Sequence, residues 1–266
     1  MVASTVRQDE PEHGTLYDLS IVVPAHNEAA HIAATLDGLE QAFEDWDVEL
    51  IVVDDGSTDA TATEVRRLHD RHADYTVQLI TLTPNRGKGG ALCRGTAAAR
   101  GAWVAWIDAD GDIAPGELVP LVQQAQQHGS IVVGNKQHQV WQNAGVPRWR
   151  KLVSRSFAKL VKTLYHLPIN DTQTGCKVFP GAWIRRTVGD VQAVGFLLDL
   201  EVLARAHLAA VPMAEHPITV NPQRTVNRIG ARHIVRSMAE LLALHWRMRL
   251  LHREARQGGH GADLHV

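Results

Sequence analysis

Cysteine and long apolar runs are both scarce in this chain of 266 residues, and each absence excludes a class of protein. The two cysteines, Cys93 and Cys176, are too few for a disulfide scaffold or a cysteine-ligated zinc cluster, and they indicate a reducing compartment. No apolar run reaches the roughly 18 residues of a transmembrane helix. Residues 1–18 are polar and acidic and lack the apolar core of a secretory signal. We therefore expect a cytoplasmic protein.

Charge is divided unevenly along the chain. Hydrophobic residues make up 45% and charged residues 21%, a composition that excludes a disordered chain, a collagen-like fibre and a coiled coil. Residues 1–134 carry 8 Lys or Arg and 21 Asp or Glu, whereas residues 135–266 carry 19 and 8. An acidic half suits a metal ion, and a basic half suits phosphates on lipid or nucleic acid. This division predicts two surfaces with different partners.

Strand and helix patterns alternate through the first half. Strands are expected at 19–23, 48–53, 77–82, 102–107 and 131–133, and helices at 28–43, 91–100 and 115–127. The second half is less regular, with helices expected at 148–166, 196–208 and 231–256 and a strand at 212–220. Such alternation predicts an α/β fold with a mostly parallel central sheet and helices on both of its faces.

Polar or glycine-rich loops follow the expected strands. They cover residues 24–28, 54–59, 85–90 and 108–112. In a parallel sheet, ligands bind beyond the carboxyl ends of the strands, so these loops are expected to meet at one edge. Their convergence is a stronger indication of a site than any single motif.

Two carboxylates stand directly after the fourth expected strand. Asp108 and Asp110 are spaced so that both can reach one hard cation, and Asp112 is a third candidate ligand. Oxygen ligands favour Mg²⁺ or Mn²⁺. The alternative is a helix-capping loop with solvated acids. The fifteen histidines show no metal-binding spacing, although His26 is a candidate for the wall of the site.

Other loops have the chemistry of a nucleotide site. Asp55 is placed to accept a hydrogen bond from a base or a ribose, while the alternative for residues 54–59 is a turn and a helix cap. Lys88 lies in a glycine-rich segment that suits anionic oxygens at the start of a helix. The phosphate-loop spacing GxxxxGK[ST] is absent, and so is a GxGxxG after the first strand, which counts against NAD.

Taken together, these loops carry a family resemblance. The segments 22–28, 52–59, 85–89 and 108–110 resemble, in order and spacing, the family two glycosyltransferases of GT-A fold, and the likeness covers about residues 18–225. It implies inverting transfer of a sugar from a nucleotide sugar, with Mg²⁺ or Mn²⁺. By the same resemblance, Pro24, Ala25, Glu28 and Asp55 would line the nucleoside pocket, and Asp108 would serve the diphosphate. The further candidates for nucleotide binding are Asn27, Asp54 and Lys88. The resemblance implies Asp108 and Asp110 as metal ligands, beside which Asp112 remains the third candidate from its position, and Asp110 is also a candidate catalytic residue.

Within that family, further segments narrow the resemblance. Residues 108–111, 171–179 and 198–203 resemble the dolichyl-phosphate glucosyltransferases and polyprenyl-phosphate mannosyltransferases. This sequence departs from that group at Cys176 and at Leu198, where those enzymes often carry phenylalanine. The departures concern the acceptor more than the donor chemistry.

The nature of the acceptor decides which residues are needed. A phosphate acceptor is ionised near neutral pH and needs cations, for which Lys177, Arg224 and Arg228 are the candidates. A hydroxyl acceptor needs a general base, for which Asp199 is the candidate. The alternatives are surface cations for the first three residues, and for Asp199 a helix carboxylate that caps or pairs with an arginine.

The resemblance also suggests a domain organisation. We expect a polar tail at 1–17, a catalytic domain at 18–230, a basic amphipathic helix at 231–256 and a disordered tail at 257–266. The catalytic domain divides into a nucleotide-binding part, 18–134, and an acceptor part, 135–230. Six cations within 148–166 and the arginines of the last helix favour peripheral docking on the cytoplasmic face of an anionic membrane. The alternative is that their apolar stripes face the protein core.

The leading interpretation is therefore a transferase that moves a hexose from UDP-glucose or GDP-mannose to a polyprenyl or dolichyl phosphate. One rival is a soluble glycosyltransferase of the same fold that acts on a small-molecule or glycan hydroxyl. A second is a non-catalytic nucleotide-sugar binding module, against which the Asp108 and Asp110 pair counts. A nucleic-acid partner is not expected, because the basic half lacks interleaved aromatics and the acidic half would repel phosphates.

Overall fold

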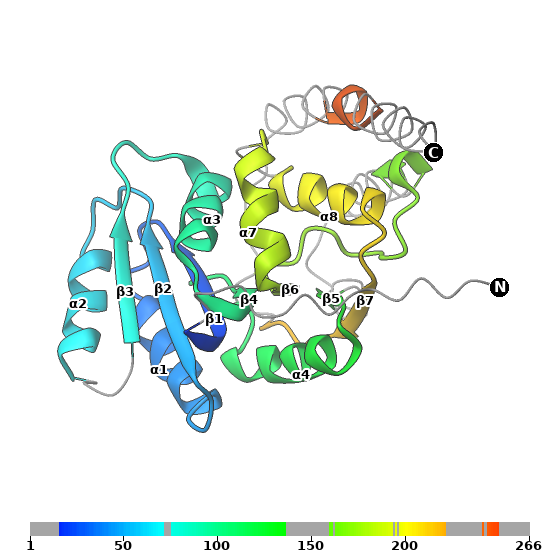
Figure 1. Ribbon diagram of the computed structural model, residues 1–266. Helices are drawn as coiled ribbons and strands as arrows, with labels where there is room; N and C mark the ends of the chain where they lie inside the picture. The colour runs from blue at the N-terminus through cyan, green and yellow to red at the C-terminus, as the bar shows by residue number, and fades with distance from the viewer. Residues whose placement is uncertain are drawn as a thin grey trace, which may run out of the picture.

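A seven-stranded sheet forms the centre of the molecule (Figure 1). The structure, a computed structural model, describes residues 16–71, 76–136, 160–161, 163–193, 195, 197–221, 241 and 244–249. The strands are β1 (Tyr17–Ala25), β2 (Val48–Asp54), β3 (Thr76–Thr81), β4 (Gly101–Trp106), β5 (Ile131–Asn135), β6 (Lys177–Pro180) and β7 (Met213–Pro217). Their order is β3-β2-β1-β4-β6-β5-β7, and only β6 runs antiparallel to its neighbours. The expected mostly parallel sheet is confirmed.

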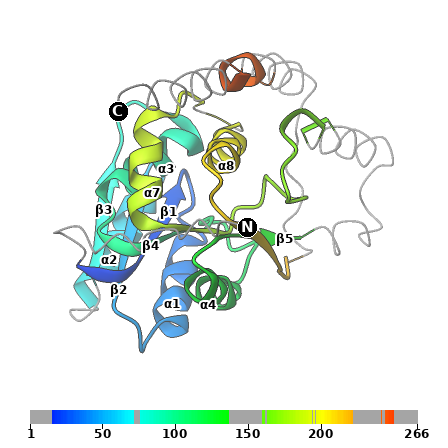
Figure 2. The same ribbon diagram turned by 45° about the vertical axis from the view of Figure 1, so that its right-hand side comes forward.

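Helices cover both faces of this sheet, as expected (Figures 1 and 2). They are α1 (Ile32–Ala42), α2 (Thr61–Arg71), α3 (Gly87–Ala98), the 3-10 turn η1 (Pro115–Glu117), α4 (Leu118–His128), α7 (Gly181–Asp190) and α8 (Leu198–Leu208). Side chains of α1, α2 and α4 belong to one hydrophobic cluster, and those of α3, α7 and α8 belong to the other. The sheet therefore separates two cores.

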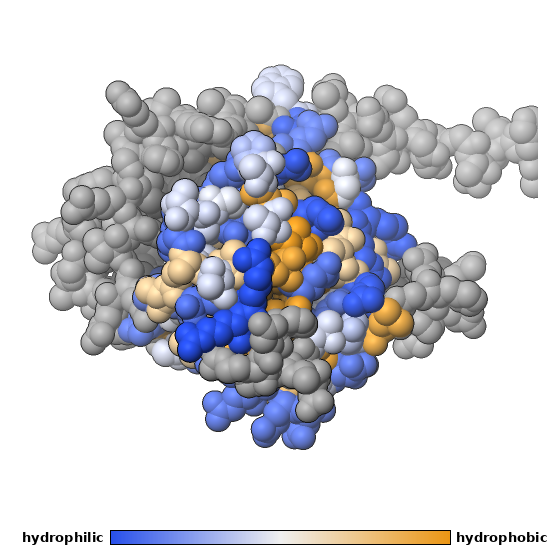
Figure 3. Space-filling model, turned by 90° about the vertical axis from the view of Figure 1, so that its left-hand side faces the viewer, coloured by the Kyte–Doolittle hydropathy of each residue, from blue (hydrophilic) through white to orange (hydrophobic). Residues whose placement is uncertain are grey.

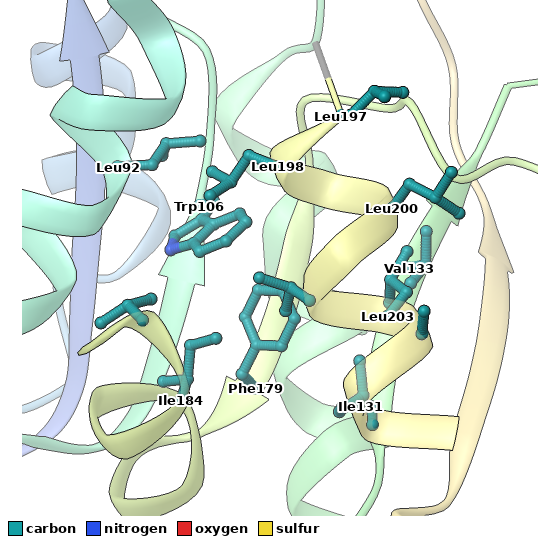
Figure 4. Close-up of a cluster of buried hydrophobic side chains, with 14 of the residues drawn as sticks. Leu92, Trp106, Ile131, Val133, Phe179, Ile184, Leu197, Leu198, Leu200 and Leu203 are labelled. Atoms are coloured by element: carbon teal, nitrogen blue, oxygen red, sulfur yellow. The ribbon is translucent and has the colours of Figure 1, made fainter. Parts of the chain in front are cut away.

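Burial on both faces explains why β2 carries four consecutive apolar residues, from Leu50 to Val53. Each of its seven residues is buried, and β-branched side chains suit such a strand. On the α3, α7 and α8 side, the rings of Trp106 and Phe179 pack with centroids 4.6 Å apart between Leu92, Ile184 and Leu203 (Figure 4). These contacts fix β4 and β6 against the helices that flank the site.

Strand β3 forms one edge of the sheet, where its neighbour is β2. Its side chains are exposed or only partly buried. The surface on that side is mostly hydrophilic around a small apolar area (Figure 3).

Some expected boundaries shift. The helix expected from residue 28 begins at Ile32, and Asn27 before it has a left-handed backbone, with φ of 57°. The helix expected at 91–100 already begins at Gly87, so the glycine-rich segment is its first turn. The strand expected at 212–220 spans only Met213–Pro217.

The expected elements did not include β6 and α7. β6 has only four residues and follows a polar loop directly, so its sequence offers little periodicity. Glycines near both ends of α7 weaken its helical pattern.

Several expectations fall largely outside the described residues. Within 148–166, residues 160–161 and 163–165 are helical, but the six cations lie outside the description. Within 231–256, residues 241 and 244–249 are helical. The tails 1–17 and 257–266 are likewise outside it, apart from Leu16 and Tyr17, and Tyr17 already belongs to β1. Among the described helices, none has both the length and the apolar character that crossing a bilayer requires.

Helix α3 lies so close to the sheet that one of its positions has room only for glycine. A Cβ added at Gly95 would overlap Val22 and would lie 2.9 Å from Val53 Cγ2, whereas one at Gly189, near the end of α7, would meet nothing within 4 Å. We predict that Gly95→Ala lowers the free energy of unfolding by about 2 kcal/mol through overpacking. Gly189→Ala, the matched control, should raise it by about 0.5 kcal/mol. Urea denaturation measures both, and equal effects would contradict this packing.

Candidate active site

A cavity of about 240 Å³ opens where the carboxyl ends of β1, β2 and β4 meet the first turns of α3. Parallel pairing puts these ends at one edge, since Ala25 is paired with Asp54 and Val22 with Trp106. The residues that line the cavity are Pro24, Ala25, His26, Glu28, Asp55, Lys88, Ala91, Asp108, Ala109 and Asp110. The loops expected to converge do so, and Ala91 and Ala109 are additions to the expected set.

Asn27 joins the first loop to the second. Its backbone N–H donates to Ser57 Oγ over 2.9 Å, and its Oδ1 accepts from the backbone N–H of Thr58 over 2.8 Å. Asn27 does not line the cavity. The structure therefore shows Asn27 in a supporting place between the two loops, and its expected nucleotide contact stays a prediction.

The adjacent carboxylates Asp54 and Asp55 have different places. Asp54 is buried, accepts from the backbone N–H of Ser57 over 2.9 Å and is not on the cavity wall. Asp55 lies on that wall, and its Oδ1 accepts from the backbone N–H of Arg86 over 2.7 Å. The turn alternative thus describes the hydrogen bond of Asp54, whereas Asp55 lies on the cavity wall; a nucleotide contact by either residue stays a prediction.

Lys88 and Asp108 form an ion pair across the cavity. Partial desolvation favours the neutral form of the ammonium, but the negative charges of Asp108, Asp199 and Asp110 outweigh it and raise the pKa of Lys88. Desolvation likewise opposes ionisation of Asp108, but Lys88, with Lys177 and Lys136, lowers the pKa of Asp108. Both groups are therefore charged at neutral pH.

Negative charge accumulates on the side of the cavity near Glu28. Burial and the charges of Asp110 and Asp108 raise the pKa of the Glu28 carboxyl. Mutual repulsion of this kind is relieved by a cation, and carboxylate oxygens suit Mg²⁺ or Mn²⁺. The paired residues Asp108 and Asp110 fit such an ion, because Mg²⁺ commonly takes one or two carboxylates and completes its shell with water and phosphate oxygens.

Asp112 does not complete a three-carboxylate metal site. Among the described residues, no three His, Cys, Asp or Glu side chains come together as a set able to hold a metal ion. The chain turns at Gly111, whose φ is 69°, and the backbone N–H of Asp112 donates to Asp110 Oδ1 over 3.0 Å. The arrangement therefore offers the Asp108 and Asp110 pair as the better candidate, and a metal contact by Asp112 stays a prediction.

Lys177 and Asp199 form a buried ion pair. Lys177 Nζ lies 2.6 Å from Asp199 Oδ1 and also donates to the carbonyl oxygen of Thr174, and its side chain is 1% exposed. Our expectation that Lys177 presents its ammonium to an acceptor phosphate is not met by this geometry. Asp199, the candidate base, is likewise occupied, by a lysine rather than the arginine that we considered.

The remaining acceptor candidates, Arg224 and Arg228, lie outside the described residues. The structure instead draws attention to Lys136, just after β5, which we did not single out. Its ammonium is near enough to Asp108 to help lower the pKa of that carboxyl, after the larger effects of Lys88 and Lys177. Its backbone N–H donates to Asp171 Oδ2 over 3.3 Å. A cation within three residues of the expected strand 131–133 was the signal that could have found it.

Known proteins resemble this chain in sequence. Dolichyl-phosphate beta-glucosyltransferase of Dictyostelium discoideum is 31% identical over 210 residues, which cover 74% of this chain and 64% of that protein. The Drosophila melanogaster protein of the same name is 31% identical over 227 residues, which cover 79% of this chain and 69% of that protein. The chain thus spans about two thirds of the length of these relatives.

Solved structures resemble it in fold. Glucosyl-3-phosphoglycerate synthase from Mycobacterium tuberculosis, in complex with UDP, has a TM-score of 0.62 at 23% identity, covering 86% of this chain and 80% of that one. A Pyrobaculum calidifontis mannosyltransferase in complex with GDP-Man and Mn²⁺ has a TM-score of 0.60 at 22% identity, covering 91% and 66%. These similarities and the sheet establish the GT-A fold. Residues 20–189 match the family model "Glycosyl transferase family 2", and the chain belongs to that family.

Proposed function

We propose that this chain is an inverting glycosyltransferase that moves a hexose from UDP-glucose or GDP-mannose to a polyprenyl or dolichyl phosphate. The observation that carries the proposal is the cavity that joins Asp55 with Lys88, Asp108 and Asp110 at one edge of a GT-A sheet. Relatives 31% identical and named dolichyl-phosphate beta-glucosyltransferase support the hexose transfer and the lipid-phosphate acceptor.

The nucleoside of the donor would bind against β1 and β2. Pro24, Ala25 and His26 form one side of the cavity, and Asp55 brings a carboxylate whose position is fixed by Arg86 N–H. A fixed carboxylate at a strand end suits a base N–H or a ribose hydroxyl. In this proposal, Asn27 and Asp54 hold the two loops in shape rather than contact the donor.

The diphosphate would lie between α3 and the end of β4. The first turn of α3 brings backbone N–H groups and the positive end of the helix dipole, and Lys88 adds a charge. Asp108 and Asp110 would hold a divalent cation, which supplies charge stabilisation for the departing nucleoside diphosphate. Glycosyl transfer then forms a bond from the acceptor oxygen to the anomeric carbon as the bond from that carbon to the donor phosphate oxygen breaks.

A phosphate acceptor agrees better with the geometry than a hydroxyl acceptor does. A phosphate monoester is ionised near neutral pH, so its oxygen needs no base and needs only cations to hold it. Lys136, Arg224 and Arg228 are the proposed cations, and Lys177 is left out because it is buried. A hydroxyl acceptor would need a base, and Asp199 already accepts from Lys177. This observation weighs against the soluble hydroxyl-directed alternative.

Transfer of labelled hexose to a lipid phosphate tests this proposal directly. With Mn²⁺ or Mg²⁺ and a short polyprenyl phosphate, label from radioactive UDP-glucose or GDP-mannose should move into the organic phase. Asp110→Asn should lower this transfer at least about 100-fold, since it removes charge from the proposed cation site. Asp37→Asn, an exposed acid on α1 outside the cavity, is the matched control and should retain full activity.

Two other outcomes would be informative. Label found only in a water-soluble product would contradict the lipid acceptor but leave the donor chemistry in place. Failure of both UDP and GDP to bind with Mn²⁺ would contradict the glycosyltransferase proposal itself.

We further propose that the protein docks peripherally on the cytoplasmic face of a membrane. In the helical residues 244–249, Leu244 and Met248 are buried, whereas Trp246 is 66% exposed and Arg249 is exposed. An exposed tryptophan beside arginine suits the interface between lipid headgroups and acyl chains. One face of this segment is therefore in the core, as the alternative held, and the other is available to lipid.

Vesicle binding tests this docking. The protein should sediment with vesicles that contain anionic lipid and less well at high salt. Trp246→Ser should weaken binding about tenfold, the effect of one large apolar side chain withdrawn from lipid. Leu16→Ser, which alters another exposed apolar residue at the opposite end of the described chain, should have no effect. Equal binding by the unaltered protein and Trp246→Ser would exclude this surface.

A further inference from the structure

Lys177 is a buried cation to which the proposed reaction gives no role. It is the first residue of β6, and the antiparallel register pairs it with Trp106 at the carboxyl end of β4. The reversed strand thus brings its amino end to the edge of the sheet that carries the cavity. A buried ammonium is tolerated only where it is paired and hydrogen-bonded, and Asp199 Oδ1, at 2.6 Å, and the Thr174 carbonyl satisfy this one.

The residue after Thr174 lies directly against a carboxylate of the cavity. A Cβ added at Gly175 would overlap the Asp108 carboxylate and would lie 3.1 Å from its Oδ1. The backbone at Gly175 therefore forms a wall on which Asp108 rests. Because the Lys177 ammonium donates to the carbonyl oxygen of Thr174, it helps to fix the position of the backbone at Gly175.

Two ion pairs lie close to the backbone at Gly175. Lys88 is paired with Asp108, and Lys177 is paired with Asp199. The two pairs also act on each other, because Asp199 contributes to the raised pKa of Lys88, after Asp108, and Lys177 contributes to the lowered pKa of Asp108, after Lys88. Loss of Lys177 would remove a contact and a positive charge from the same side of Asp108.

We infer that Lys177 is a positioning residue for Asp108: it holds the turn Thr174–Gly175 in place and thereby sets the carboxylate at which a divalent cation and the donor diphosphate would bind. The inference rests on the proposed role of Asp108 in donor binding. It does not depend on the identity of the acceptor, so a failure of lipid transfer leaves it intact.

Mn²⁺ binding in the presence of UDP or GDP tests the inference without turnover. Free Mn²⁺ is counted by electron paramagnetic resonance as protein is added. Lys177→Met should weaken Mn²⁺ binding about 10- to 100-fold, the usual effect of losing a group that orients a metal ligand. The KM for a polyprenyl phosphate should stay within about twofold, which separates this role from contact with the acceptor.

Two further variants separate positioning from stability. Lys177→Met with Asp199→Leu removes both charges of the buried pair and should recover much of the thermal stability that Lys177→Met loses, but not the Mn²⁺ affinity. Glu49→Gln alters another buried carboxylate, which accepts from the Arg100 N–H over 2.6 Å near the amino end of β2. This control should lower the melting temperature and leave Mn²⁺ affinity unchanged.

Each remaining outcome has a definite meaning. Unchanged Mn²⁺ affinity in Lys177→Met, or recovery of that affinity in the double variant, would overturn the positioning role. A raised KM for polyprenyl phosphate with normal Mn²⁺ affinity would instead make Lys177 an acceptor contact. Absence of Mn²⁺ binding by the unaltered protein, with UDP and with GDP, would overturn the positioning role together with the proposed function.

Discussion

Parallel pairing of β1 with β2 on one side and β4 on the other is the constraint on which the site depends. It brings three strand ends to one edge, where Ala25 is paired with Asp54 and Val22 with Trp106. Parallel strands need both faces covered, and the two hydrophobic cores provide that cover. The backbone beyond each strand then turns away from the core, and polar side chains there are free to gather around a ligand.

Two glutamates, Glu201 and Glu28, show how the surroundings of a carboxylate decide its role. Glu201 is fully buried, and it accepts from Arg205, from Arg247 and from the backbone N–H of Ala193, so its charge is compensated and ties α8 to the C-terminal helical residues. Glu28, in contrast, shares a cavity with other acids and has a raised pKa because of burial and their charge. Compensated charge holds the fold together, whereas uncompensated charge beside a cavity is available for chemistry.

Much of this arrangement could be predicted from the sequence, because it follows from local patterns. The apolar run of β2 predicts a buried strand, and the polar residues directly after strands predict an edge at which Asp55, Lys88 and Asp108 meet. Prediction that relies on local patterns misses short elements with little periodicity, such as β6 and α7. The helical residues 244–249 matched the expected period, but only the structure shows which face is covered.

Side-chain partners that are distant in the chain could not be predicted in this way. Asn27 binds Thr58, 31 residues away, and Lys177 binds Asp199, 22 residues away. A motif tells which residue types a site requires, but it does not tell which member of the motif faces the ligand and which holds its neighbour. That assignment depends on strand direction and burial, which are properties of the folded chain.

Strand direction is the clearest case. Parallel strands bring to this edge of the sheet the residues that follow them, but β6 runs the other way and brings its first residue and the loop before it. The backbone at Gly175 lies nearest to Asp108 Oδ2, whereas Lys88 is paired with Asp108 Oδ1. A carboxylate with a neighbour at each oxygen has less freedom to rotate, and stabilisation of developing charge requires such preorganisation. Among the described strands, β6 thus adds a backbone support for Asp108 that a parallel strand in its place would not provide.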